Sequence, residues 1–143
     1  MFEKILYPTD FSHEAHKALD FVVCLKDAGA REVVILHVID KGSSDAIARY
    51  ATKDILEIEK NLKERAMAEI LPIEGRLKKE GLKVKVIITK AVPYMGILDV
   101  EKKEKVSVIV IGSHGMSNIA EIFLGSVSEK IVRRAKSPVL VVR

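Results

Sequence analysis

Hydrophobic residues along the chain occur at two spacings, in short continuous runs and in helix-like stripes. A strand that is buried on both faces gives a continuous apolar run, whereas a helix that packs on one side repeats its apolar residues every three to four positions. Because helix-like stripes separate the runs, the sequence predicts alternating strands and helices. The predicted strands are Lys4–Pro8, Val33–Ile39, Val84–Ile88, Val106–Ile111 and Pro138–Val142.

Several predicted helices are bounded by residues that favour helix ends. The first follows Ser12, which suits an N-cap, and stops near Gly29. Pro93 suits the first position of a later helix, which runs to about Glu104. The last helix is marked by Val127, Ile131, Val132 and Ala135.

Residues 43–81 leave two interpretations open. The polar run Asp40–Asp45 predicts a loop, and a helical stripe follows over Ile55–Leu77. Pro72 within that stripe predicts a kink or a split near Ile70, because proline removes one helix hydrogen bond. The segment is therefore either one helix with a proline kink or two helices that form a lid.

The alternation of strands and helices predicts an α/β fold. Its expected core is an open, doubly wound, five-stranded parallel sheet of order 3-2-1-4-5, flavodoxin-like or Rossmann-like, with helices on both faces. In such sheets ligands bind beyond the carboxyl ends of the strands, where the strand order reverses. This rule selects two loops as candidate sites, Pro8–Ser12 and Gly112–Ser126.

Composition narrows the function classes. The 143 residues fit one domain over 1–143, with 48% hydrophobic and 31% charged residues. A net charge of +4 is too small to indicate a dedicated nucleic-acid surface. A single cysteine, Cys24, excludes an intramolecular disulfide and is expected to be a small buried hydrophobe. The start of the chain has no signal-peptide layout and no apolar run approaches membrane-spanning length, so we expect a cytoplasmic protein with no membrane contact.

The loop Gly112-Ser113-His114-Gly115, followed after nine residues by Gly125-Ser126, is the strongest chemical signal. Glycines let a backbone approach a ligand closely, and a helix that starts at Gly125-Ser126 favours phosphate at its N-terminus. The same residues also fit a capping box, with Ser126 as N-cap and Glu129 reaching back. The spacing alone leaves phosphate binding and helix capping about equally supported.

The same loop resembles the nucleotide-binding signature of the universal stress protein family. Three other stretches are similar to that family, namely Ile5–Ser12, Leu36–Asp40 and Ser137–Val142. The resemblance spans nearly the whole chain. On these motifs the chain is identified as a single-domain member of the ATP-binding type.

The resemblance implies a five-stranded α/β sandwich, commonly a homodimer, that holds ATP in the cleft where the strand order reverses. The sequence leaves open whether ATP, ADP or AMP is preferred and whether Mg²⁺ accompanies the nucleotide. The resemblance also implies that Asp10 faces the ribose and the nearby phosphate, and that Val38 meets the adenine. The full expected nucleotide-binding set is Pro8, Thr9, Asp10, Val38, Ile111, Gly112, His114, Gly115, Gly125, Ser126, Val127 and Ser128.

Two positions depart from the family pattern. Ala91 stands where the family often has glycine, which predicts an altered turn at the mouth of the cleft. Ser107 stands where many members have an acidic residue. Neither position lies in the glycine-rich loop.

Other polar residues have competing interpretations. Asp10 suits a Mg²⁺-bridging carboxylate at a strand end, and it also suits a cap for the turn that follows. Its position at the switch in strand order favours the ligand role. His13 and His16 lie three residues apart at a helix start, and two histidines do not form a metal cage, so we expect both in solvent. His37 lies within a buried strand and is expected to be a core histidine with a hydrogen-bond partner.

The residues named above agree with two functions. The first is a regulatory protein of the stress response that binds an adenine nucleotide and changes its contacts with unknown protein partners. The second is a slow Mg²⁺-dependent ATPase or phosphotransferase that uses the same site. The chain has no G-x-x-x-x-G-K-[ST] loop, no G-x-G-x-x-G after the first strand and no acceptor aspartate after the third, which excludes a P-loop enzyme, a dinucleotide dehydrogenase and a phosphorelay receiver.

The last predicted strand gives a reason for dimerisation. Val139–Val142 is apolar and belongs at an edge of the predicted sheet. An exposed apolar edge favours pairing with another chain. The sequence therefore predicts a homodimer in which this strand pairs with its own copy.

Overall fold

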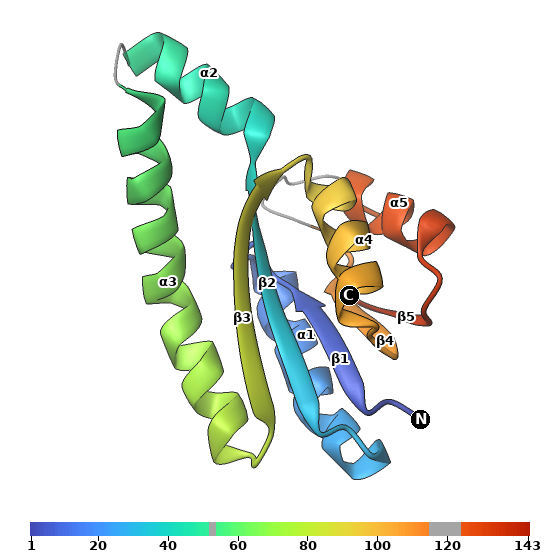
Figure 1. Cartoon of the computed structure of the whole chain (residues 1–143). Coiled ribbons are helices and arrows are strands. Elements are labelled where there is room, and N and C mark those ends of the chain that lie inside the picture. The colour runs from blue at the N-terminus through green and yellow to red at the C-terminus, as the bar shows by residue number, and fades with distance from the viewer. Residues whose placement is uncertain (52–53, 115–123) are drawn as a thin grey trace.

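A computed structural model describes residues 1–51, 54–114 and 124–143 of the chain. All neighbouring strands pair in parallel, and the sheet order β3-β2-β1-β4-β5 confirms the predicted order 3-2-1-4-5 (Figure 1). The strands are β1 (Lys4–Pro8), β2 (Glu32–Asp40), β3 (Lys83–Ala91), β4 (Val108–Gly112) and β5 (Val139–Val142).

Helices cover both faces of the sheet, as predicted. They are α1 (His13–Cys24), a 3-10 helix η1 (Leu25–Ala28), α2 (Lys41–Ala51), α3 (Ile55–Lys79), α4 (Pro93–Glu104) and α5 (Ser126–Arg134). The apolar stripes of α1 and α3 form one core cluster against the sheet, and those of α4 and α5 form a second cluster on the opposite face. No helix in the described part of the chain is long and apolar enough to span a membrane.

The predicted helix ends are confirmed where capping chemistry is strong. The Ser12 side chain accepts a hydrogen bond from the Ala15 N–H at 3.2 Å, which caps α1. Gly29 has φ 102° after η1, a left-handed conformation that favours glycine. Pro93 occupies the first turn of α4, where its missing N–H costs no hydrogen bond.

The predicted loop at Asp40–Asp45 is wrong, because α2 begins directly after β2. Asp40 Oδ1 accepts a hydrogen bond from the Gly42 N–H at 3.0 Å, and the Ser44 hydroxyl donates to the Lys41 carbonyl at 3.2 Å. Glycine and serine favour helices weakly, which is why this polar run suggested a loop. A carboxylate placed before the first turn and bonded to its N–H offsets that weak preference.

The split predicted near Ile70 is also wrong, because α3 runs without a break over 25 residues. Pro72 is exposed, while its neighbours Ile70 and Ile73 are buried against the sheet. The hydrogen bond that proline removes therefore lies on the solvent side, and packing of the opposite face holds the helix together. The described residues of this segment thus belong to α2, up to Ala51, and to α3, with Asp54 as the N-cap of α3.

Two smaller expectations also change. Cys24 is exposed, not buried, because the buried stripe of α1 ends at Val22 and Cys24 points away from it. The fourth strand begins at Val108, two residues later than predicted, because the Ser107 N–H and hydroxyl both bond to the Lys4 carbonyl.

The strands differ in length in a way that shapes the carboxyl edge of the sheet. β2 and β3 pair over nine positions each, whereas β1 ends at Pro8, opposite Leu36. The last residues of β2 and β3 therefore continue beyond β1 as a two-stranded extension that leads into α2 (Figure 1).

Candidate functional site

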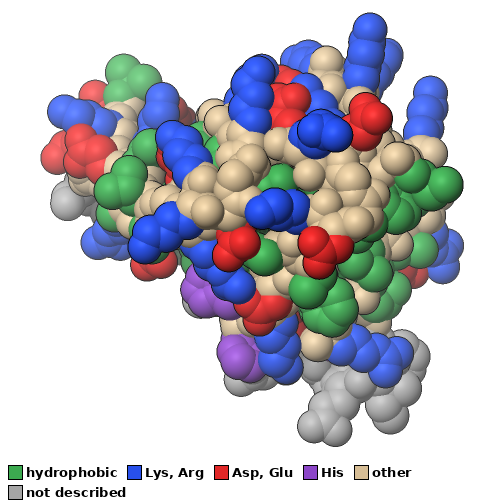
Figure 2. Space-filling model, turned by 90° about the horizontal axis from the view of Figure 1, so that it is seen from below, with side chains coloured by type: hydrophobic (Ala, Val, Ile, Leu, Met, Phe, Trp, Pro, Cys, Tyr) green, Lys and Arg blue, Asp and Glu red, His purple; other side chains and the backbone are tan. Residues whose placement is uncertain are grey.

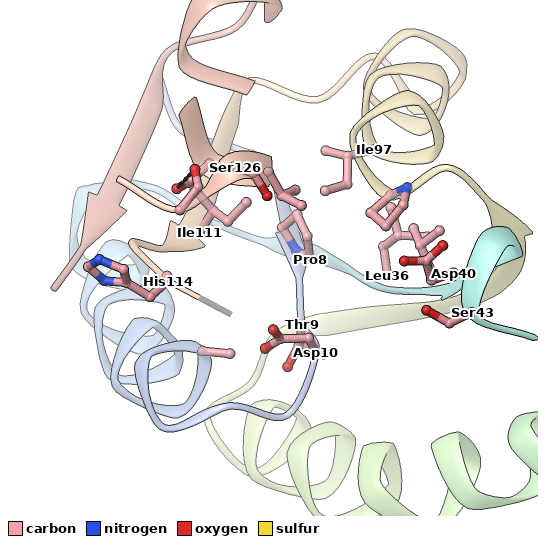
Figure 3. Close-up of a pocket in the computed structure, with 17 residues that line it drawn as sticks. Pro8, Thr9, Asp10, Leu36, Asp40, Ser43, Ile97, Ile111, His114 and Ser126 are labelled. Carbon is pink, nitrogen blue, oxygen red and sulfur yellow. Dashed lines mark hydrogen bonds between the residues drawn. The ribbon is translucent and has the colours of Figure 1, made fainter. Parts of the chain in front are cut away.

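A pocket opens at the carboxyl ends of β1, β2 and β4, where the strand order reverses (Figure 3). Its volume is about 430 Å³, within the range of about 300–1,000 Å³ that small-molecule sites occupy. The position agrees with the general rule for open α/β sheets.

All predicted nucleotide-binding residues that the structure describes line this one pocket. They come from the β1–α1 loop, from β2, from the end of β4 and from the start of α5. The set is Pro8, Thr9, Asp10, Val38, Ile111, Gly112, His114, Gly125, Ser126, Val127 and Ser128. Gly115, the remaining member, lies outside the described residues.

Further lining residues were not predicted, and they are Ala15, Leu36, Asp40, Ser43, Pro93 and Ile97. Asp40 had a usable signal, because it ends the second apolar run, and that strand neighbours the first in the predicted sheet. Ser43 had no such signal, because the polar run that contains it predicts a loop. Leu36 and Ile97 are apolar residues that also belong to the core, so a sequence pattern does not separate their two roles.

One side of the pocket is an apolar wall. Val38, Ile97 and Ile111 contribute to it from β2, α4 and β4. A Cβ atom on Gly96 of α4 would lie only 3.1 Å from Val38 Cγ2. The close approach of α4 at this glycine therefore sets the position of the Val38 side chain. Such a wall suits a flat, apolar ring.

The β1–α1 loop is held by its own short-range contacts. Asp10 Oδ1 accepts from the Ser12 N–H at 3.0 Å, and Thr9 Oγ1 accepts from the Phe11 N–H at 3.0 Å. Phe11 has φ 64°, and its ring stacks on His37 at a centroid distance of 4.6 Å. Asp10 therefore caps the turn, as one interpretation proposed. No described residue bonds to Asp10 Oδ2, so the second carboxylate oxygen remains available to a ligand.

His37 bonds into the same loop. Its Nδ1 lies 2.8 Å from the Thr9 carbonyl oxygen, which confirms the expected hydrogen-bond partner and ties β2 to the loop. The expected place in the core is wrong, because His37 is only half-buried. His13 and His16 are both exposed on α1, as expected. Below the loop, the buried Tyr7 hydroxyl donates to the Ala15 carbonyl, and burial raises the pKa of Tyr7 to about 12.

The β4–α5 connection brings the start of α5 back to the end of β4. The Gly125 N–H and the Ser128 hydroxyl both donate to the Ser113 carbonyl at 2.7 Å. Gly125 is the N-cap of α5, so the capping box with Ser126 as N-cap is wrong. Ser126 is instead the first helical residue, and its side chain faces the pocket (Figure 3).

Gly112 has a structural reason to be glycine. A Cβ atom there would lie 2.9 Å from both the Ala15 backbone nitrogen and the Glu14 carbonyl carbon. The backbone of α1 thus packs directly on the end of β4. This contact requires glycine whether or not a ligand is bound.

His114 lines the pocket on the opposite side to Asp40, with its ring turned away from the other labelled side chains (Figure 3). Its Nδ1 lies 2.8 Å from the Ser113 hydroxyl oxygen. Its Nε2 is buried, and no described residue bonds to it. A buried ring nitrogen without a partner is costly.

The metal chemistry of the site rests on few groups. Within residues 1–51, 54–114 and 124–143, no cluster of three or more histidine, cysteine or carboxylate side chains could hold a metal ion by itself. Asp10 and Asp40 are the carboxylates that line the pocket. A Mg²⁺ ion there would need further oxygen ligands from a phosphate.

The sequence and the structure of this chain are similar to those of known proteins. A profile described as the Universal stress protein family matches residues 1–143. Universal stress protein MJ0577 of Methanocaldococcus jannaschii is 39% identical over 155 residues, which cover 100% of this chain and 96% of the relative. The solved structure of MJ0577 superposes with a TM-score of 0.89, at 40% identity, over 99% of this chain and 96% of that one.

Two more distant structures share the fold and contain nucleotides. A universal stress protein solved in complex with cAMP is 22% identical, with a TM-score of 0.71 over 99% of this chain and 97% of that one. A universal stress protein from Archaeoglobus fulgidus solved in complex with dAMP is 22% identical, with a TM-score of 0.64 over 100% and 98%.

Proposed function

The chain belongs to the universal stress protein family, and from this membership we propose that it binds an adenine nucleotide, ATP, ADP or AMP, in the pocket at the carboxyl edge of the sheet. The whole chain, residues 1–143, would act as one nucleotide-binding domain. The observation that carries the proposal is the meeting, in one pocket, of predicted residues from separate segments of the chain.

The two ends of the pocket suit the two ends of a nucleotide. Ser126, Val127 and Ser128 form the first turn of α5, where N–H groups have no helical acceptors and the helix dipole favours anions. The phosphates would lie at this end, with His114 beside them. The Ser128 hydroxyl already donates to the Ser113 and Gly125 carbonyls. The group that Ser128 would offer to phosphate is therefore its backbone N–H.

The opposite end suits the nucleoside. Val38 and Ile97 offer an apolar surface to the adenine ring, and Asp10 and Asp40 offer carboxylate oxygens to ribose hydroxyls. Carboxylates near a phosphate would repel it unless a cation lay between them. If Mg²⁺ accompanies the nucleotide, Asp10 is the side chain that would reach it through its open oxygen. The distant relatives with bound cAMP and dAMP support an adenine nucleotide as the ligand class.

We assign the nucleotide a regulatory role in the stress response. Fast phosphoryl transfer needs positioned metal ligands and a base in addition to a bound phosphate, and the described pocket offers only Asp10, Asp40 and His114 for these tasks. Slow Mg²⁺-dependent hydrolysis is the alternative, since a carboxylate and an imidazole do line the pocket. A phosphate-release assay with ATP and Mg²⁺ separates the two, because a binding protein releases no phosphate above the rate without protein.

Isothermal titration calorimetry with ATP, AMP and adenosine, with and without Mg²⁺, tests the binding. The matched variants are Ser126→Ala and Ser126→Asp. Removing the hydroxyl should weaken ATP binding about 3- to 10-fold, the value of one hydrogen bond. The aspartate should weaken it about 10- to 100-fold through repulsion of the phosphates, while adenosine binding stays unchanged.

Folding provides the control for these variants. An acidic residue in the first turn stabilises a helix, so Ser126→Asp should melt no lower than the wild type. Ser137→Ala, at the other edge of the sheet, removes a serine that bonds to the Val106 carbonyl and should leave nucleotide affinity unchanged. No binding by the wild type would reject the proposed function. Equal loss of ATP and adenosine in Ser126→Asp would reject the assigned orientation.

The homodimer belongs to the same proposal. Val139, Leu140 and Val141 of β5 are only partly buried at the edge of the sheet, and β5 pairs with β4 on its other side. Pairing of β5 with a second copy would cover this edge. Sedimentation of the wild type at micromolar concentration should give a dimer, and a Leu140→Lys variant should shift it toward monomer. A monomeric wild type would contradict the proposal.

A further inference from the structure

We propose that Lys90 is a positioning residue for this pocket: by holding α2 against the end of β3, it places Ser43 and Asp40 at the nucleoside end. The inference rests on the proposed nucleotide binding and extends it to a part of the chain that no motif indicated. Lys90 itself does not line the nucleotide pocket, so it would act only through α2.

The first observation is that α2 forms one wall of the pocket. The β2–β3 extension pairs His37 to Asp40 with Ile88 to Ala91, beyond the point where β1 ends. Helix α2 follows without a loop, and Asp40 and Ser43 at this junction face into the pocket (Figure 3). The shape of the nucleoside end therefore depends on where α2 lies.

The second observation is that the hydrophobic core does not hold α2. Neither core cluster contains a residue of α2 among the described residues. Its larger apolar side chains face solvent, since Ile47 is 48% exposed and Tyr50 is 92% exposed. The position of this helix must therefore depend on polar contacts more than that of any helix packed on the sheet.

The third observation supplies those contacts. Lys90 Nζ lies 2.8 Å from Asp45 Oδ1 on α2 and 2.5 Å from Glu59 Oε1 on α3. The ammonium thus joins the end of β3 to both helices at one point, and its side chain is only 24% exposed. The hydrogen bond from Lys90 lowers the pKa of Asp45, and the bond to Asp45 is the first cause that raises the pKa of Lys90, so both remain charged at neutral pH.

The geometry links this ion pair to the pocket through a short stretch of helix. Asp45 lies two residues after Ser43, so a helix fixed at Asp45 is also fixed at Ser43. A carboxylate and a hydroxyl bind groups such as ribose hydroxyls or the adenine amine. The effect of Lys90 should therefore fall on the nucleoside and not on the phosphates at α5.

The test compares two alanine variants that remove different partners of the same lysine. Asp45→Ala frees α2, whereas Glu59→Ala breaks the pair to α3 and leaves Asp45 in place. Adenosine, ATP and inorganic tripolyphosphate are titrated into each variant and into Lys90→Met. We expect Asp45→Ala and Lys90→Met to weaken adenosine and ATP binding about 3- to 10-fold, the value of one misplaced hydrogen bond. Glu59→Ala should match the wild type, and tripolyphosphate binding should be the same in all proteins.

A double-mutant cycle supplies a readout that loss of stability would not move. If Lys90 acts through Ser43, then Ser43→Ala combined with Lys90→Met should cost no more than the larger single effect. Additive losses would overturn the proposal, as would unchanged adenosine affinity in both Asp45→Ala and Lys90→Met. Equal weakening in Glu59→Ala would also overturn it, because that result indicates general loosening of the fold.

Failure of the inference and failure of the proposed function remain distinguishable. A wild type that binds none of the three ligands rejects the function, and the positioning role with it. A wild type that binds adenosine and ATP with the same affinity as Lys90→Met rejects only the positioning role. Circular dichroism and thermal melting of each variant show whether the fold is retained, and Lys85→Met on the same strand is the control for loss of a lysine.

Discussion

The two edges of the sheet carry similar polar residues and use them in opposite ways. At the amino edge, where the strands begin, the polar side chains of Lys4, Glu101 and Ser107 bond to other side chains or to the backbone. At the carboxyl edge, where the strands end, several polar atoms have no partner among the described residues. This difference separates groups that hold the fold from groups that are available to a ligand.

The amino edge shows how complete internal pairing can be. Glu101 is buried, and its Oε1 accepts from the Lys136 and Ser137 N–H groups at 2.8 and 2.7 Å. The Lys4 N–H donates to the Ser107 hydroxyl, and Lys4 Nζ pairs with Glu104 at 3.0 Å. Acidic and basic side chains are intermixed over the face seen from this edge (Figure 2). Ser107 is thus a structural bridge between β1 and the start of β4.

The carboxyl edge keeps several polar atoms unpaired beside its own internal bonds. Asp10 and Asp40 each use one carboxylate oxygen to accept a nearby N–H, and within the described chain nothing bonds to the other oxygen. His114 Nε2 is buried and likewise unbonded there. Unmet hydrogen-bonding capacity at a switch in strand order is the pattern that a ligand would complete.

The largest effect that this comparison predicts belongs to Glu101. Replacing it with alanine removes two charge-assisted hydrogen bonds from the turn between α5 and β5. Unfolding free energy should fall by about 2–4 kcal/mol, measured by urea denaturation. Nucleotide affinity in the folded protein should stay unchanged. A variant that kept its stability but bound ATP more weakly would reverse the assignment of the two edges.

Gly112 is an exception at the carboxyl edge, because it lines the pocket but is predicted to be required for packing of α1 on β4. In Gly112→Ala the new Cβ would meet backbone atoms of α1 at 2.9 Å, and backbone cannot move aside as a flexible side chain can. Stability should fall by about 1–3 kcal/mol, the usual cost of overpacking. Gly75→Ala in α3 is the matched control, since its Cβ meets nothing within 4 Å. That variant should gain about 0.5–1 kcal/mol in thermal or urea unfolding.

Equal stability of Gly112→Ala and the wild type would show that α1 can move away from β4. In that case only ligand binding, and not packing, would require glycine at this position. Measuring nucleotide affinity in the same variant separates the two roles, because a purely structural glycine lowers stability even without nucleotide.

The fold could be predicted because its signals are local and repeated. Runs such as Val33–Ile39 and capping residues such as Ser12 and Pro93 each specify one element, and right-handed crossovers leave few ways to connect them. The prediction failed where tertiary packing overrides a local preference. Pro72 is tolerated because it faces solvent, and Gly42 is tolerated in α2 because Asp40 caps that helix.

The candidate site could be predicted only in part. The glycine-rich loop and Asp10 could be predicted, because their residue types stand at the ends of predicted strands. Ser43 could not, because it reaches the pocket only through the extension of β2 and β3 beyond β1. Strand lengths relative to one another depend on pairing across the sheet, which no single run of residues encodes. The role of Lys90 could not be predicted either, because its partners Asp45 and Glu59 lie on two helices that are distant from it in the sequence.

Glu104 gives the smallest predicted effect and completes the contrast on helix α4. It lies one turn beyond Glu101, but its partners are Lys85, 53% exposed and 2.6 Å away, and Lys4. The hydrogen bond from Lys85, followed by that from Lys4, lowers the pKa of Glu104. A carboxyl whose pKa is lower in the folded protein stabilises it above the unfolded pKa of about 4.3, and this contribution is lost as the pH falls through the folded value.

Glu104→Gln should therefore cost less than about 1 kcal/mol at pH 7, because the Lys85 partner is half exposed and ion pairs that reach the surface contribute little. The difference from the wild type should shrink toward zero in urea unfolding at pH 3, and also in high salt, which screens the pair at neutral pH. A difference that persisted at pH 3 would mean that Glu104 acts through packing and not through charge. A cost as large as that of Glu101→Ala would mean that partner exposure does not distinguish Glu101 from Glu104, and that the amino edge is held by ion pairs as much as by buried hydrogen bonds.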